Sequence, residues 1–237
     1  MPNPYFRFKQ FTIYHDRCAM KVGTDGVLLG AWADVSDAYH VLDVGTGTGL
    51  IALMIAQRNG SVRIDAIDMD ADAIGQATEN IGKSPFASRI RCFNRSFQNF
   101  GINPRKKYDV IVSNPPFFIE SLKSPRQDRT LARHTDSLPV EELISAASLL
   151  LTDKGRISLI YPYNYKDGLF ALAAQNNLSV SRVANVYPTP DSKPKRILIE
   201  LAKTQLPLME NDLIIEMDRH SYSDEFIGLA KDFYLKL

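Results

Sequence analysis

The stretch VLDVGTGTG, residues 41–49, joins a short apolar run to glycines at positions 45, 47 and 49. Glycine tolerates positive φ and lets a ligand approach the backbone, and a helix that starts here presents free N–H groups. The next segment, GLIALMIAQR at 49–58, carries the apolar face of such a helix. The pattern predicts a strand, a tight turn and a helix, with a small ligand bound where the strand ends.

Outward from this turn, apolar runs rich in Val and Ile alternate with segments of helical period. The alternation is typical of a parallel sheet with crossover helices, and two later runs without a helix between them favour an antiparallel pair. The candidate strands are 40–44, 63–68, 89–94, 108–113, 156–161, 179–188 and 196–203. The candidate helices after the first are one capped by Asp70 or Asp72, then 138–151 and 165–174.

These elements predict an α/β, Rossmann-like fold: a seven-stranded, mostly parallel sheet with a reversed last strand and helices on both faces. That arrangement is typical of class I methyltransferases. We predict that residues 1–39 form an N-terminal extension, with a hairpin at 6–14 and a helix that Thr24 could cap. Residues 40–237 are expected to form a single compact methyltransferase domain that closes with a helix at about 223–236.

Composition excludes several classes of protein. Lys and Arg total 28 against 27 Asp and Glu, so the net charge of +1 gives no global attraction to nucleic acid or membrane. Cys18 and Cys92 have no CxxC partner and the four histidines show no ligand spacing, so no metal is expected. Apolar stretches are too short to cross a bilayer and no signal peptide is evident, which favours a cytoplasmic protein without a membrane partner.

The acidic residues around the turn indicate which ligand it binds. A dinucleotide fingerprint needs glycine at position 50, where Leu50 stands, and the carboxylate of Asp43 would repel a pyrophosphate. Asp43 suits the cationic amino-acid end of S-adenosylmethionine instead. Asp68, at the end of the next strand, is placed to accept hydrogen bonds from ribose hydroxyls. A nicotinamide-dependent oxidoreductase is therefore disfavoured, although a binding module without catalysis stays open.

A second motif, SNPPFF at 113–118, follows the apolar run 108–112. Proline lacks the N–H that a central strand needs, so the chain leaves the sheet here, at the crevice that the glycine turn faces. The side-chain oxygen of Asn114 and the carbonyl of Pro115 could accept hydrogen bonds from an aromatic exocyclic amine, which is otherwise a weak nucleophile. Pro116 would add rigidity and Phe117 would stack on a flipped base. The alternative is a strand terminator with phenylalanines in the core.

Four stretches resemble one known family over nearly the whole chain: 9–33, DVGTGTGL at 43–50, SNPPFF, and EFIGLAKDFYLKL at 225–237. They resemble the bacterial tRNA(Val) adenine-N6-methyltransferases, which act on adenosine 37. The resemblance implies S-adenosylmethionine as cofactor, tRNA as partner, and N6-methyladenosine as product. It implies a catalytic motif of Asn114, Pro115, Pro116 and Phe117, and it implies that Lys21, Thr24 and Asp25 line the cofactor site next to Asp43. The other candidate cofactor-binding residues are Gly45, Gly47, Asp68 and Asn114.

Two positions after the third strand bear on the cofactor's adenine. Ser96 stands where related enzymes often carry an acidic residue that holds the adenine amine, which departs from the pattern of the family. Phe97 could pack on the adenine ring, although a phenylalanine at this point is just as typical of a core. Both are kept as candidate cofactor-binding residues.

Basic side chains after the motif are candidate contacts to RNA phosphates, with a solvated loop as the alternative. They are Lys123, Arg126, Arg129 and Arg133, followed by His134. Methylation of a ribosomal RNA base or of a protein glutamine amide would use the same pair of acceptors, so both stay open as alternative activities.

Overall fold

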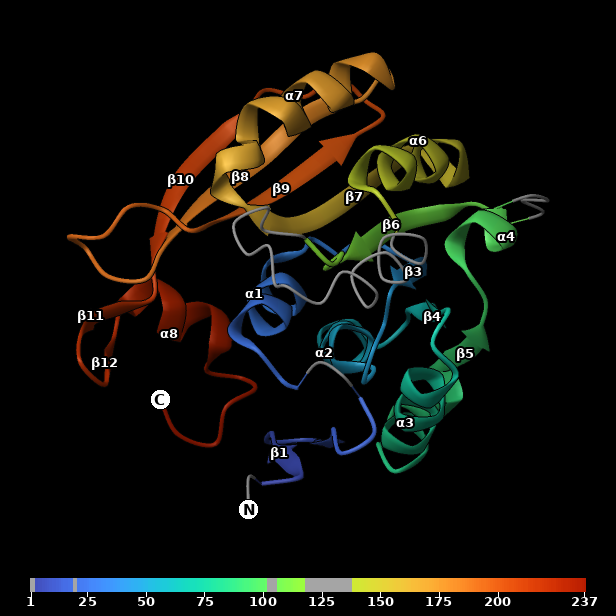
Figure 1. The fold of residues 1–237 in the computed structure, drawn as a ribbon, viewed down its shortest axis with the longest axis vertical. Helices are drawn as coiled ribbons and strands as arrows, with labels where there is room; N and C mark the ends of the chain where they lie inside the picture. The colour runs from blue at the N-terminus through green and yellow to red at the C-terminus, as the bar shows by residue number, and fades with distance from the viewer. Residues whose placement is uncertain (1–2, 19–20, 102–105, 118–137) are drawn as a thin grey trace, which may run out of the picture.

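The computed structural model describes residues 3–18, 21–101, 106–117 and 138–237. Within this part of the chain, the largest sheet has eight strands in the order β10-β8-β9-β7-β6-β3-β4-β5 (Figure 1). Its strands are β3 (His40–Val44), β4 (Arg63–Asp68), β5 (Ile90–Asn94), β6 (Tyr108–Ser113), β7 (Leu151–Pro162), β8 (Ser179–Tyr187), β9 (Arg196–Ala202) and β10 (Met209–Ile214).

The pairing confirms the predicted fold class. Strands β5, β4, β3, β6 and β7 pair in parallel, whereas β9 is antiparallel to both β7 and β8. The reversed strand is thus β9, which corresponds to the second strand of the predicted antiparallel pair. The sheet holds one strand more than the seven predicted, because β10 pairs in parallel with β8 at the edge.

Helices cover both faces of the sheet, as predicted (Figure 1). Side chains of four helices share one hydrophobic cluster with the N-terminal hairpin, and side chains of three helices share the other. The first group is α1 (Thr24–Trp32), α2 (Leu50–Arg58), α3 (Ala71–Gly82) and α8 (Asp224–Ala230); the second is α4 (Phe97–Gly101), α6 (Val140–Leu150) and α7 (Lys166–Gln175). Short 3₁₀ turns are η1 (Ala87–Arg89) and η2 (Tyr163–Tyr165).

Helix α2 lies at the centre of the first layer, because its residues from Leu50 to Ala56 are all buried. Helix α1 packs against it closely. A side chain at Gly30 would come within 2.8 Å of the Met54 sulfur, so only glycine allows this approach. The contact fixes α1, and with it Thr24 and Asp25, beside the glycine turn that begins α2.

The N-terminal hairpin is present as predicted, with β1 (Tyr5–Arg7) antiparallel to β2 (Thr12–Tyr14). Its aromatic side chains pack on the C-terminal segment, where Phe8 bridges to Tyr234 and the Lys9 amide donates to the carbonyl of Phe233 at 2.8 Å. Both ends of the chain therefore lie on one side of the molecule (Figure 1). A further small pair, β11 (Glu216–Asp218) and β12 (Ser221–Tyr222), precedes α8.

Several predicted boundaries need correction. Thr24 is the first residue of α1 and does not cap it; Gly23 takes the N-cap position without a side-chain hydrogen bond. Strand β7 starts at Leu151, directly after α6, and not at residue 156. Ser223 caps α8, but the helix ends at Ala230, because the following residues turn back onto the hairpin. Asp70, and not Asp72, caps α3.

Among the helices of the described residues, none is long and apolar enough to pass through a bilayer.

Candidate active site

The ends of three adjacent strands meet at one level of the sheet. Val44 pairs with Ile67 on one side and with Ser113 on the other. The Ser113 hydroxyl also donates to the carbonyl of Val44 at 2.8 Å, which ties β6 to β3 at this edge. Asp68 is therefore level with the first glycine of the turn, and Asn114 leaves the sheet beside it. The two motifs singled out in the sequence share one edge, as predicted.

The glycine turn exposes bare backbone to this edge. Gly45, Gly47 and Gly49 have φ of 70°, 54° and 82°, a region that L side chains rarely adopt. Space beside Gly45 and Gly47 is open: apart from the adjoining residues of the turn, no atom of the described residues lies within 4 Å of where a side chain would begin. At Gly49 the same position lies only 3.3 Å from Ile81 on α3, so this glycine serves packing. The first two glycines leave room for a ligand against the main chain.

Asp43 is fully buried under the turn, with 0% of its surface exposed. The Thr46 hydroxyl donates to its Oδ2 at 2.6 Å, while Oδ1 has no hydrogen-bond partner among the described residues. Burial raises the pKa of the Asp43 carboxyl from 3.8 to about 7, and the Thr46 hydrogen bond and a smaller contribution from the Ala52 backbone amide oppose that rise. A buried carboxylate oxygen without a partner suits a cationic ligand group, which would favour the ionised form.

Asp68 connects the turn to the next strand. Its Oδ2 accepts a hydrogen bond from the Gly47 amide at 2.9 Å, and its Oδ1 accepts one from the Asp70 amide at 3.0 Å. Burial raises the pKa of Asp68 above its ordinary value. A carboxylate has about four lone-pair sites, so hydroxyl groups of a ligand could still donate to it.

The two candidates after β5 have structural roles. The Ser96 hydroxyl accepts from the Asn99 amide at 3.3 Å, at the start of α4. Phe97 is only 4% exposed and belongs to the hydrophobic cluster under α6. Core packing, the alternative that the sequence left open for Phe97, agrees with this burial. Contact of either residue with a cofactor adenine stays a prediction.

The residues of the 21–25 segment differ in their surroundings. Lys21 and Thr24 are exposed. Asp25, by contrast, accepts a hydrogen bond from the Arg196 Nε at 2.8 Å across to the start of β9. The carboxylate of Asp25 thus has a protein partner, which the sequence did not predict.

The SNPPFF motif presents Asn114 and Phe117 as half-buried side chains, with Pro115 buried and Pro116 exposed between them. The Phe117 ring lies 4.5 Å from the Arg196 guanidinium carbon, and its centroid is 6.1 Å from that of Tyr161 at an interplanar angle of 78°. The predicted RNA contacts at Lys123, Arg126, Arg129, Arg133 and His134 lie outside the described residues.

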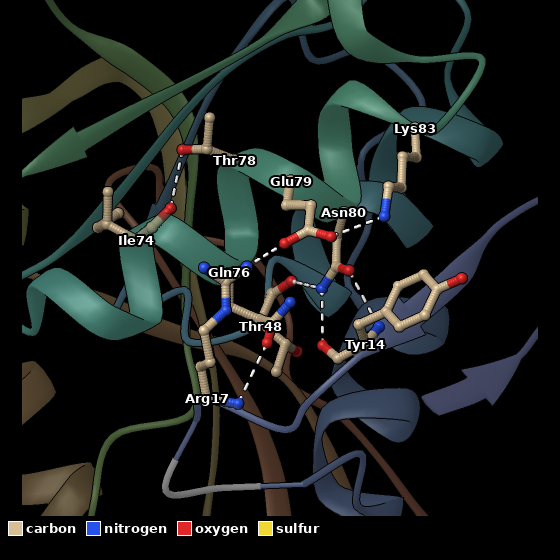
Figure 2. Close-up of polar contacts among 9 residues, drawn as sticks. All are labelled: Tyr14, Arg17, Thr48, Ile74, Gln76, Thr78, Glu79, Asn80 and Lys83. Atoms are coloured by element: carbon tan, nitrogen blue, oxygen red, sulfur yellow. Dashed lines mark hydrogen bonds and ion pairs between the residues drawn. The ribbon is translucent and has the colours of Figure 1, made fainter. Parts of the chain in front are cut away.

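Helix α3 holds the segment that precedes Lys21 beside the turn (Figure 2). The Asn80 amide group donates to the carbonyls of Tyr14 and Thr48, both at 2.9 Å, and its oxygen accepts from the Tyr14 amide at 2.9 Å. One turn earlier, the Gln76 oxygen accepts from the Arg17 amide at 3.2 Å. Sequence reasoning missed these residues, although two amides spaced i, i+4 on the apolar face of α3 were a signal for them.

Sequence reasoning also missed Thr46 and the pairing of Arg196 with Asp25; the KPKR cluster at 193–196 suggested only a contact to RNA phosphates. Thr46 lies inside the quoted glycine stretch, and a hydroxyl three residues after a buried acid was a detectable signal. Arg196 lies 171 residues from Asp25, and no local pattern connects the two.

The sheet topology places the buried Asp43 and its glycine turn at the same end of the sheet as SNPPFF. Together these features define a Rossmann-like methyltransferase. The family model described as the methyltransferase small domain matches residues 23–169 of this chain. Over the full length of both chains, the sequence is 53% identical to a tRNA1(Val) (adenine(37)-N6)-methyltransferase of Parabacteroides distasonis. It is 50% identical, over 98% of each chain, to the Trichodesmium erythraeum protein of the same name. The chain belongs to this family of methyltransferases.

Solved structures of lower identity support the fold. A predicted O-methyltransferase of Agrobacterium tumefaciens superposes with a TM-score of 0.68 at 16% identity, covering 88% of this chain and 96% of that chain. The P. horikoshii TYW2 structure, in complex with MeSAdo, superposes with a TM-score of 0.58 at 14% identity, covering 84% and 71%. At these identities the likeness concerns the fold alone.

Proposed function

We propose that this enzyme transfers a methyl group from S-adenosylmethionine to the exocyclic N6 amine of adenosine in tRNA, at position 37 of tRNA(Val). One observation carries the proposal: the turn after Asp43, Asp68 and Asn114 lie next to one another, at the carboxyl ends of three adjacent strands. The names of relatives that are 53% and 50% identical support the substrate. S-adenosylmethionine, when bound, supplies an electrophilic methyl group.

The residues around the turn fit this cofactor. The open space beside Gly45 and Gly47 admits a ligand against the backbone. The carboxylate of Asp43, buried beneath the turn, would attract a cationic ammonium group, and Asp68 would accept from ribose hydroxyls. Lys21 and Thr24 would complete the rim of this site.

Asn114 and Pro115 would prepare the target amine. The lone pair of an aromatic amine is delocalised into the ring, so acceptors that draw its N–H bonds out of the ring plane make the nitrogen more nucleophilic. The Asn114 side-chain oxygen and the Pro115 carbonyl can be those acceptors, because the two prolines hold the backbone rigidly. Phe117 would stack on the base once it has left the RNA stack.

The test compares substrates that share this amine chemistry. The full chain is incubated with S-adenosylmethionine and an unmodified tRNA(Val) transcript, and the digested RNA is analysed by mass spectrometry. We expect N6-methyladenosine at position 37 and none in a transcript with guanosine there. Ribosomal RNA and a release factor protein serve as competing substrates. Methylation of either one, with unmodified tRNA left unchanged, would contradict the proposal and favour the runner-up activities.

We also propose that the extension at 1–39 and the domain at 40–237 act as one catalytic unit in the cytoplasm. The packing of the hairpin on the C-terminal segment supports the first part. The proposed tRNA substrate supports the second.

A further inference from the structure

We infer that Arg196 is a positioning residue for the methyl transfer: anchored by Asp25, it fixes the ring of Phe117 against which the target base stacks. The inference rests on the proposed function. It names a side chain that lies outside both sequence motifs, at the start of the reversed strand β9.

The anchor of Arg196 is well defined. Its Nε donates to Asp25 Oδ2 at 2.8 Å, and its Nη1 donates to the carbonyl of Lys195 at 3.1 Å. The side chains of Arg196 and Asp25 are 28% and 26% exposed, so the pair is partly shielded from water. Because α1 is fixed by its close approach to α2 at Gly30, Asp25 is a rigid support for the guanidinium.

The contact with Phe117 completes the arrangement. The guanidinium carbon of Arg196 lies 4.5 Å from the ring centroid, within the roughly 6 Å range of a cation–π contact. Tyr161 reaches the same ring from β7, and Pro162 pairs with Arg196 in the antiparallel β7–β9 register. Two neighbouring strands therefore restrict the orientation of a side chain that otherwise follows two prolines out of the sheet.

This geometry separates a positioning role from a phosphate contact. If Arg196 orders Phe117 by stacking on it, removal of the arginine lowers the turnover number, because the base is no longer held in line for attack. An arginine that binds an RNA phosphate weakens RNA binding and makes that binding less dependent on salt. The two roles therefore predict different changes in kcat, KM and salt dependence.

The same geometry gives Asp25 a role different from the predicted lining of the cofactor site. If Asp25 supports Arg196, Asp25→Asn lowers kcat on RNA and leaves the Kd for S-adenosylmethionine unchanged. A cofactor contact would instead weaken cofactor binding.

The experiment measures kcat, KM and the salt dependence of RNA binding for Arg196→Ala, Arg196→Lys and Asp25→Asn. Lys203→Ala is the control, because it removes one positive charge at the opposite end of β9. We expect Arg196→Ala to lower kcat about tenfold with an unchanged salt slope, since the contact is a partly shielded cation–π pair. Arg196→Lys keeps a cation and recovers part of that loss, and Lys203→Ala changes neither quantity.

A fluorescent base gives a second readout that does not depend on turnover. With 2-aminopurine at position 37, emission brightens once the base has left the RNA stack, and its anisotropy is high when the base is held against Phe117; Arg196→Ala lowers that anisotropy. The inference is overturned if Arg196→Ala leaves both kcat and the anisotropy at wild-type values, or if it raises only KM and makes the salt slope shallower. A wild-type enzyme inactive on tRNA rejects the proposed function instead. If Arg196→Ala does not fold, the Lys and Asp25→Asn variants decide the question.

Discussion

The hydroxyl of Thr46 donates a 2.6 Å hydrogen bond to a carboxylate that is wholly removed from solvent, that of Asp43. This bond satisfies one carboxylate oxygen and leaves the other without a partner among the described residues. Because burial raises the pKa of Asp43 to about 7, the group is poised to change charge near neutral pH. Binding of a cation at this point should therefore depend on pH.

We predict that the affinity for S-adenosylmethionine rises with pH through about 7, since only ionised Asp43 attracts the ammonium group. For a group with this pKa the gain between about pH 6 and pH 8 is about tenfold. Isothermal titration at several pH values measures it. The control ligand is 5′-methylthioadenosine, which lacks the amino-acid end and should bind equally across the range. Thr46→Val removes the bond that holds the pKa down, so its midpoint should move upward. A profile that is flat for both ligands contradicts this role.

A related prediction concerns stability without ligand. The folded pKa of Asp43 lies above its ordinary 3.8, so its contribution to stability is present below about pH 4 and is lost as pH rises through about 7. Asp43→Asn removes this loss. Urea unfolding should show that the variant gains stability over the wild type as pH increases from 4 to 8. A constant difference between the two proteins would mean that Asp43 does not titrate in this window.

Asn80 is expected to be the most costly amide to remove near the site. Asn80→Ala leaves the amide and carbonyl of Tyr14 and the carbonyl of Thr48 without their partner, at a position only 1% exposed. We expect a loss of about 2–3 kcal/mol in the free energy of unfolding. Thr78→Ala on the exposed side of the same helix removes a bond to the Ile74 carbonyl and one to the Cys92 thiol, and should cost below about 0.5 kcal/mol (Figure 2). Equal losses would contradict the role of Asn80 as a clamp.

Two glycines offer a matched test of the turn. Gly49 has φ of 82°, and a side chain there would meet Ile81 at 3.3 Å, so Gly49→Ala should destabilise by more than about 1 kcal/mol. Gly75, inside α3, has open space around it, and Gly75→Ala should stabilise by about 0.4–1 kcal/mol. Thermal unfolding of both variants measures the difference. The two substitutions should change the stability in opposite directions; a stabilising Gly49→Ala would show that the turn does not need glycine there.

The sequence predicted the fold well where burial imposes a simple pattern. Strands β3, β4 and β6 have the predicted bounds, because each is a short run rich in Val or Ile whose central residues are mostly buried. Strand β10 was missed since its residues MENDLI are mostly exposed, and a polar edge strand carries no such signal. The cap of α1 was wrong because a hydroxyl near a helix start does not by itself show which residue takes the N-cap position.

At the site, short-range patterns were informative and long-range contacts were not. The strand order predicts that the glycine turn and SNPPFF lie at the same end of the sheet, and the register of β3 with β6 confirms this. The partner of Asp25 could not be found, because Arg196 approaches it only once β9 has inserted between β7 and β8.

The central claim is that the Asn114 side-chain oxygen acts on the target amine in the transition state, although the residue is also expected to line the cofactor site. The most direct test is a single-turnover methylation of tRNA by Asn114→Ala, with the Kd for S-adenosylmethionine measured on the same protein. The account predicts a rate at least about 100-fold lower, the size of loss seen when one preorganised polar contact to a transition state is removed. It also predicts a cofactor Kd within about twofold of wild type, as expected for an interaction made only in the transition state. An unchanged rate, or a loss explained entirely by weaker cofactor binding, would contradict it.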